Sequence, residues 1–254
     1  MSTTVGETGA DYLAVHVGLG TAATRIIMVC ILAASLAKQL AARSYVPGVY
    51  WLTVVLVSVV GTQITDVLTD KLNVSLYAST AALAVALAIT FAVWYGVERT
   101  LSIHTIVTIR RELFYWTAIL FTFALGTAAG DLATEALGLG FTVGVFVFSA
   151  LIALIAVAYY LGANAVLTFW LAYILTRPLG ASLGDLLSQA GTYGGFGWGT
   201  IYTSLAFLAV IIALVAWITL STDRSAANRS VYPQTVLHPD PRDVARIQSG
   251  GERR

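Results

Sequence analysis

Aspartates recur at one fixed spacing inside apolar runs of this 254-residue chain. Each follows a glycine by five residues and a tryptophan by fifteen. The three copies of this W-x9-G-x4-D pattern are Trp51, Gly61 and Asp66; Trp116, Gly126 and Asp131; and Trp170, Gly180 and Asp185. A carboxylate at the centre of a bilayer costs about 3 kcal/mol, so its repetition indicates either a function or polar contacts between helices.

The N-terminus supplies a fourth copy without its beginning. Gly6 precedes Asp11 by five residues, and Gly20 follows Asp11 at the offset at which Gly140 follows Asp131. The matching tryptophan would lie before Met1. We therefore expect the native N-terminus to begin upstream, with an aromatic-rich apolar stretch in frame, and the first helix here to be short of a turn or more.

The four aspartates are expected at one depth. Fifteen residues of helix place each aspartate about 22 Å beyond its tryptophan. Carboxylates that face one another on related helices cannot all be ionised, so some would be protonated or share a cation. One hypothesis is therefore an ion- or proton-binding site on the axis of the repeats, formed by Asp11, Asp66, Asp131 and Asp185. Equally open is a structural role, in which each aspartate bonds threonine, tryptophan or backbone groups of the neighbouring repeat.

Three charged residues break the repetition and mark where specific function could enter. Glu7 adds a second carboxylate one turn from Asp11, and is interpreted either as an extra ligand or as part of a frayed end. Arg25 lies within an apolar run, where an arginine usually pairs with a carboxylate, so we expect it to pair with an aspartate or with Glu7. Arg177 is predicted to line an inner cavity beside a kink at Pro178.

Small residues four apart precede each aspartate. Such pairs let helix backbones approach closely in lipid, so the first helix of each copy is expected to pack inward. The pairs are Gly6 and Ala10; Gly61 and Thr65; Gly126 and Gly130; and Gly180 and Gly184.

Composition fixes the broad class. Apolar residues make up 58% of the chain, charged residues 11%, and the mean hydropathy is +0.82. Each copy carries a second apolar run, at about 21–40, 76–97, 141–161 and 200–220. The sequence predicts an all-α polytopic membrane protein with four two-helix parallel repeats, nominally eight spans with the first truncated.

The expected domain is transmembrane over residues 1–221, with repeats at about 1–43, 44–110, 111–162 and 163–221. Residues 222–254 are polar and predicted to be disordered. The loops between repeats and the tail carry most of the arginines, so the positive-inside rule places them, and the C-terminus, in the cytoplasm. Trp51, Trp116 and Trp170 then lie near that interface and are interpreted as membrane-interface anchors.

The segments GETGADYLAVHVGLG, FYWTAILFTFALGTAAGDLATEALGLG, AYILTRPLGASLGDLL and GGFGWGT together resemble one bacterial family. It consists of multispanning membrane proteins catalogued as a tandem repeat of unknown function, with four copies of a two-helix unit that each carry a tryptophan. The resemblance covers about residues 1–220 and departs from the pattern where the first copy lacks its tryptophan. It implies the fold and a bacterial cytoplasmic (inner) membrane location, and it carries no activity.

The functional hypothesis is a small transporter or channel-like protein for a cation or a proton-coupled solute, with the aspartates as its site. The alternative is a non-transporting membrane scaffold or sensor in which they are structural. No nucleophile with a base, phosphate loop or metal-ligand pairing is present, so an enzyme and a cofactor are not expected. The expected partners are the lipid bilayer and a small cation or proton, and not nucleic acid; which metal would bind, and the oligomeric state, stay open.

Overall fold

The computed structural model describes residues 20–42, 46–106 and 108–231, apart from the side chains of His104, Glu135, Tyr193 and 218–231. Seven helices among these residues are long and apolar enough to cross a membrane. They are α2 (Thr21–Ala41), α3 (Pro47–Asp66), α4 (Leu76–Glu98), α5 (Ile109–Asp131), α6 (Gly140–Tyr160), α7 (Ala165–Ser188) and α8 (Thr200–Val231). The predicted all-helical membrane fold is confirmed; the predicted helix before residue 20 lies outside the described residues.

Local sequence explains where several helices begin. Pro47 occupies the first turn of α3, where its missing N–H costs nothing. The Ser75 side chain accepts a hydrogen bond from the Ala78 N–H at the start of α4. The Asn164 side chain accepts bonds from the N–H groups of Val166 and Leu167 at the start of α7. These caps satisfy backbone donors that a helix leaves unpaired at its N-terminus.

The connections alternate between two ends of the bundle. The loop end carries the connections between repeats, at residues 42–46, 99–108 and 161–164; the turn end carries those within repeats, at 72–75, 137–139 and 189–199. At the turn end, α3 and α5 continue into π-helical turns, η2 (Val67–Lys71) and η4 (Leu132–Ala136). Short 3-10 turns, η3 (Ile103–Thr105) and η5 (Gly191–Tyr193), lie in two of the longer connections.

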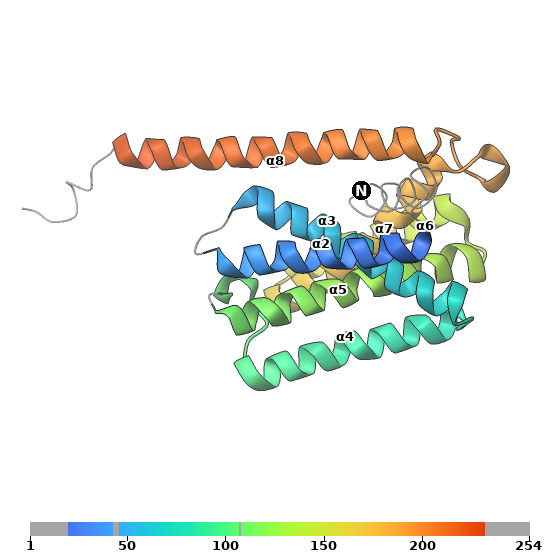
Figure 1. Cartoon of the computed structure of the whole chain (residues 1–254), viewed down its shortest axis with the longest axis horizontal. Helices are drawn as coiled ribbons and strands as arrows, with labels where there is room; N and C mark the ends of the chain where they lie inside the picture. Colours follow the sequence, from blue (N-terminus) through green and yellow to red (C-terminus); the bar gives the residue numbers. More distant parts are fainter. Residues whose placement is uncertain (1–19, 43–45, 107, 232–254) are drawn as a thin grey trace, which may run out of the picture. The chain divides into compact units, whose positions relative to one another are not determined.

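The second helix of a repeat packs on the first helix of the next repeat. Among the described elements, α2 packs on α3, α4 on α5 and α6 on α7, and Figure 1 shows α4 running beside α5. The first helices also contact one another in sequence order, because α5 packs on both α3 and α7. Helices α3 and α5 are accordingly the most buried spans of the described chain.

The chain divides into two compact units, Met1–Ile212 and Ala213–Arg254. The first holds α2 to α7 and the start of α8. In the second, the described backbone is helical to Val231. Helix α8 therefore includes residues 222–231 of the predicted tail, and residues 232–254 lie outside the described residues. The predicted disorder of the tail stays a prediction.

Candidate functional site

Three of the four predicted aspartates are described, and they occupy equivalent positions at the turn end. Asp66 is the last residue of α3 and Asp131 the last of α5, and each is followed directly by a π-helical turn. Asp185 lies near the end of α7, which has no such turn. All three side chains are half-buried and already interact with other groups of the protein. Single π turns in helices are frequent at functional sites.

Asp11, Glu7 and Gly6 lie outside the described residues, so their part of the predicted ring stays a prediction. Within the described ranges, no three Asp, Glu, His or Cys side chains lie close enough together to hold a metal ion. Asp66, Asp131 and Asp185 lie on α3, α5 and α7, and α5 packs on both of the other two helices.

Hydroxyl groups link the aspartate-bearing helices close to the carboxylates. The hydroxyls of Thr62 and Thr127, equivalent residues of α3 and α5, lie 3.3 Å apart. Thr65, the residue before Asp66, donates its hydroxyl hydrogen to the Ala124 carbonyl at 2.9 Å. At the loop end, the hydroxyls of the equivalent Tyr50 and Tyr115 lie 2.6 Å apart. The contact between α3 and α5 thus matches equivalent residues at both ends.

Two of the predicted packing glycines, Gly61 and Gly126, lie where helices approach closely. A Cβ added at Gly61 would lie 2.7 Å from Phe123 Cβ, and one at Gly126 would overlap Arg177 Cβ. One at Gly130 would meet Ala181 Cβ at 3.5 Å, an ordinary contact. In α7, Gly184 is buried and Gly180 is half-buried. Since Phe123 and Arg177 each precede their repeat's glycine by three residues, the α3–α5 contact recurs between α5 and α7.

Arg177 is a charged residue buried at the contact between α5 and α7. Only 8% of it is exposed, and its guanidinium carbon lies 3.5 Å from the centre of the Phe123 ring. This cation–π contact holds the charge among α5 and α7 rather than in open solvent. Arg177 also interacts with further groups of the protein. The arginine thus belongs to the helix contact formed by Gly126, and the inner cavity predicted for it stays a prediction.

Arg25 lies in α2 and is half-buried. Its Nη1 atom is buried and has no hydrogen-bond partner, and it forms no ion pair with a described carboxylate. Among the described residues, no ion pair joins Arg25 to Asp66, Asp131 or Asp185. Pairing with Glu7 or Asp11 involves residues outside the described ranges.

The repeated tryptophans gather in an aromatic cluster near the loop end. Trp116 and Trp170 are each 4% exposed, and the Trp170 indole N–H donates to the Leu101 carbonyl at 3.0 Å. Trp94 of α4, which the repeat pattern does not include, is 1% exposed and its ring centre lies 5.8 Å from that of Trp170. Burial favours a packing role for Trp116 and Trp170 over contact with lipid headgroups. Trp51 is half-buried, and the depth of all three in a bilayer stays a prediction.

Sequence reasoning missed one charged cluster at the loop end. The Glu98 carboxylate accepts from Arg110 Nε at 2.5 Å and from Arg111 Nε at 2.6 Å, and its side chain is only 5% exposed. Arg111 also donates to the Thr105 carbonyl at 2.8 Å. The cluster joins the end of α4 to the start of α5. The sequence did contain a sign of this cluster, because a glutamate ends one apolar run and two adjacent arginines begin the next.

One family model matches the chain, and its description is a repeat of unknown function (DUF347). It matches four segments, residues 1–45, 49–100, 114–163 and 168–223. No curated protein and no solved structure matches the chain significantly.

Proposed function

Because the chain belongs to this repeat family, whose description assigns no activity, we propose a function from the described site itself. The protein is a small membrane transporter or channel-like protein that moves a cation, or couples a solute to protons, through its intramembrane aspartates. One observation carries this proposal. Three aspartates occupy equivalent positions on the first helices of their repeats, and these helices contact one another in chain order; the aspartates are Asp66, Asp131 and Asp185.

The surroundings of the aspartates support this role. Partly buried carboxylates near the end of a span can release and bind a proton or cation more readily than fully buried ones. Local π turns after Asp66 and Asp131 distort the helix at the point where a ligand would bind. Asp11 and Glu7, outside the described residues, are proposed to complete the site. The proposal assigns no catalytic role to any residue.

A membrane scaffold or sensor is the second candidate. It is favoured by the hydroxyl contacts of Thr62 and Thr65 across the helices, and by the interactions that Asp66, Asp131 and Asp185 already make within the protein. In that case the carboxylates lock the repeats together and bind no ion. Both proposals place the protein in the bacterial inner membrane with its loop end and C-terminus on the cytoplasmic side.

The deciding experiment is thermal unfolding of purified protein across pH and a panel of cations, for the wild type, Asp131→Asn and Asp70→Asn. Asp70 is a suitable control because it is an exposed carboxylate of η2, near the same end. A ligand at a hundred times its Kd stabilises the folded state by about 2.7 kcal/mol. If the protein is a transporter, one cation, or protons, should raise the unfolding temperature of the wild type. Of the two variants, only Asp131→Asn should lose this response.

Flux into proteoliposomes then tests the same ion, and Asp131→Asn should abolish it. A wild-type midpoint that ignores every cation and pH, together with an Asp131→Asn protein that is only less stable, would establish the scaffold instead.

A further inference from the structure

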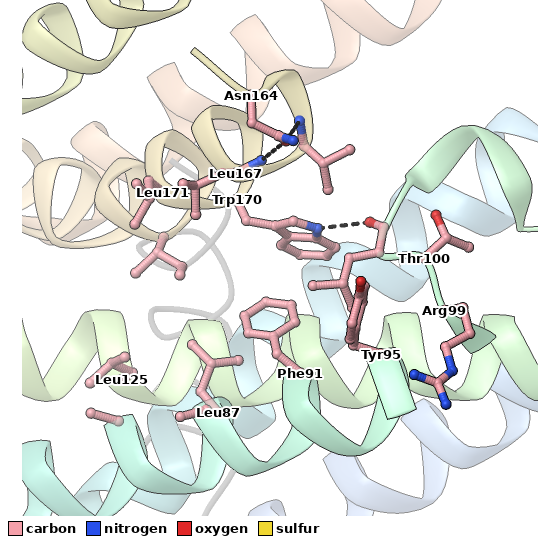
Figure 2. A pocket seen from close by; sticks show the side chains of 15 residues that line it. Leu87, Phe91, Tyr95, Arg99, Thr100, Leu125, Asn164, Leu167, Trp170 and Leu171 are labelled. Atoms are coloured by element: carbon pink, nitrogen blue, oxygen red, sulfur yellow. Dashed lines mark hydrogen bonds between the residues drawn. The ribbon is translucent and has the colours of Figure 1, made fainter. Parts of the chain in front are cut away.

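An open groove runs between α4 and α7, with α5 as its base, and encloses about 730 Å³ (Figure 2). Leu87 and Phe91 of α4, Leu125 of α5 and Leu171 of α7 line its length, so the groove is apolar over most of its extent. It lies within the first compact unit and is distinct from the aspartates at the turn end.

The groove is accessible from the side of the bundle. Ala84 and Ala88 form the α4 wall and both are exposed, so small side chains keep this side open. On the opposite wall, Leu167 is 58% exposed and Leu171 is 43% exposed. Because these helices are long and apolar enough to span a membrane, the groove would open towards lipid acyl chains.

Of the aromatic side chains that line the groove, Phe91 and Trp170 offer no hydrogen bond to a ligand, whereas Tyr95 is exposed and carries a hydroxyl nearer the loop end. Trp170 borders the groove and is buried, and its indole N–H already donates to the Leu101 carbonyl (Figure 2). Trp donates only through this one group. A ligand beside Phe91 and Trp170 is therefore selected by apolar shape, as an alkyl chain would be.

Charge enters only at the loop end of the groove. Arg99 lines that end, where it follows α4 in a left-handed conformation (φ 56°) with its N–H bonded to the Tyr95 carbonyl. The neighbouring Arg110 and Arg111 are held by Glu98, whereas Arg99 is exposed and forms no ion pair among the described residues. The groove thus combines a long apolar channel with one uncompensated cation at its mouth.

We propose that the groove binds an acyl chain of an anionic glycerophospholipid whose phosphate lies at the Arg99 guanidinium. Basic residues at the cytoplasmic surface attract anionic headgroups, and each contributes about 1 kcal/mol. The loop end is also the end that the arginine distribution predicts to face the cytoplasm. The apolar walls then bury the chain while Arg99 selects the headgroup.

Native mass spectrometry of delipidated protein tests this site, with palmitoyl-oleoyl phosphatidylglycerol and the matching phosphatidylethanolamine as probes. Wild-type protein should bind phosphatidylglycerol more tightly. Arg99→Gln should weaken phosphatidylglycerol binding about fivefold and leave phosphatidylethanolamine binding unchanged. Arg110→Gln is the matched control and should change neither affinity, because Arg110 is already engaged by Glu98.

Ala88→Trp tests the groove separately, since the indole would fill the open wall. It should weaken binding of both lipids, and its unfolding midpoint without lipid shows that the protein remains folded. Equal affinities for both lipids with no effect of Arg99→Gln would overturn the headgroup assignment. A wild-type dimer that Ala88→Trp converts to monomer would show that a second copy, and not lipid, occupies the groove.

Discussion

Gly126 lies so close to Arg177 that no larger residue fits between their helices. Adding a methyl group there would force α5 and α7 apart, because the contacted atom is a Cβ fixed to the backbone. Gly126→Ala should therefore destabilise the protein by about 1–3 kcal/mol. Thermal unfolding in detergent measures this change.

Gly96→Ala is the matched control for that substitution. Gly96 lies in the last turn of α4 with nothing within 4 Å of an added Cβ. Alanine favours helix over glycine by about 1 kcal/mol, so this variant should be as stable as the wild type or more stable. An equal loss of stability in Gly126→Ala and Gly96→Ala would show that the close approach of Gly126 to Arg177 does not limit the size of the residue there.

Glu98 is the residue through which the α4–α5 connection is held. Arg111 is 25% exposed and bonds both Glu98 and the Thr105 carbonyl, whereas Arg110 is 68% exposed. Hydrogen bonds to charged groups contribute about 1.5–3 kcal/mol, and less where water competes. Arg111→Gln should lower the unfolding midpoint clearly more than Arg110→Gln does. The same midpoint for both variants would contradict this ranking.

Individual residues show what the sequence could and could not predict. The W-x9-G-x4-D spacing located the aspartates and the close-contact glycines of α3 and α5, because repetition exposes positions under a common constraint. It could not identify Trp94 or Glu98, which occur in one repeat only. It also did not predict that Phe123 and Arg177, equivalent residues of different chemistry, would stack on each other.

At the scale of elements, the α3–α5 contact depends on hydroxyls that cross between helices. Thr65→Val should remove the bond to the Ala124 carbonyl and destabilise the protein by about 0.5–1.5 kcal/mol. Thr117→Val is the control, because the Thr117 hydroxyl is exposed and bonds only within its own helix, to the Leu113 carbonyl. Thermal unfolding of the two variants tests this prediction. A larger loss of stability in Thr117→Val than in Thr65→Val would refute the role of the hydroxyl between helices.

Helix extents were predictable from apolar runs, but helix partners were not. The repeat pattern does not say which helices pack on one another, and in the structure α4 packs on α5, the first helix of the next repeat. Hydropathy cannot distinguish packing within a repeat from packing between repeats, because both bury apolar faces equally well. The π turns after Asp66 and Asp131 were likewise hidden, since neither segment, VLTDK or LATEA, contains a glycine or proline that would mark a local change of helix.

At the scale of the whole molecule, the two ends of the bundle should be accessible from opposite sides of the membrane. The single cysteine, Cys30, is exposed on α2 and would first be replaced by alanine. Ala163→Cys at the loop end should then react with a membrane-impermeant maleimide only after permeabilisation, and Thr192→Cys at the turn end without it. Labelling of Ala163→Cys in intact cells would reverse the proposed orientation.

The packing of each second helix on the following repeat has a consequence for how such chains can grow. If the residues from α3 to α4 were excised, α2 would precede α5 and could pack on it as α4 now does, because the contacts α2–α3 and α4–α5 are of the same kind. Duplicating a whole repeat would likewise recreate contacts that already exist. Gain or loss of an entire repeat therefore preserves every class of helix interface. A cut within a repeat, between α3 and α4, keeps the α2–α3 and α4–α5 pairs together and divides only one large contact, that between the first helices α3 and α5. Recombination at that turn is the exchange this architecture tolerates best.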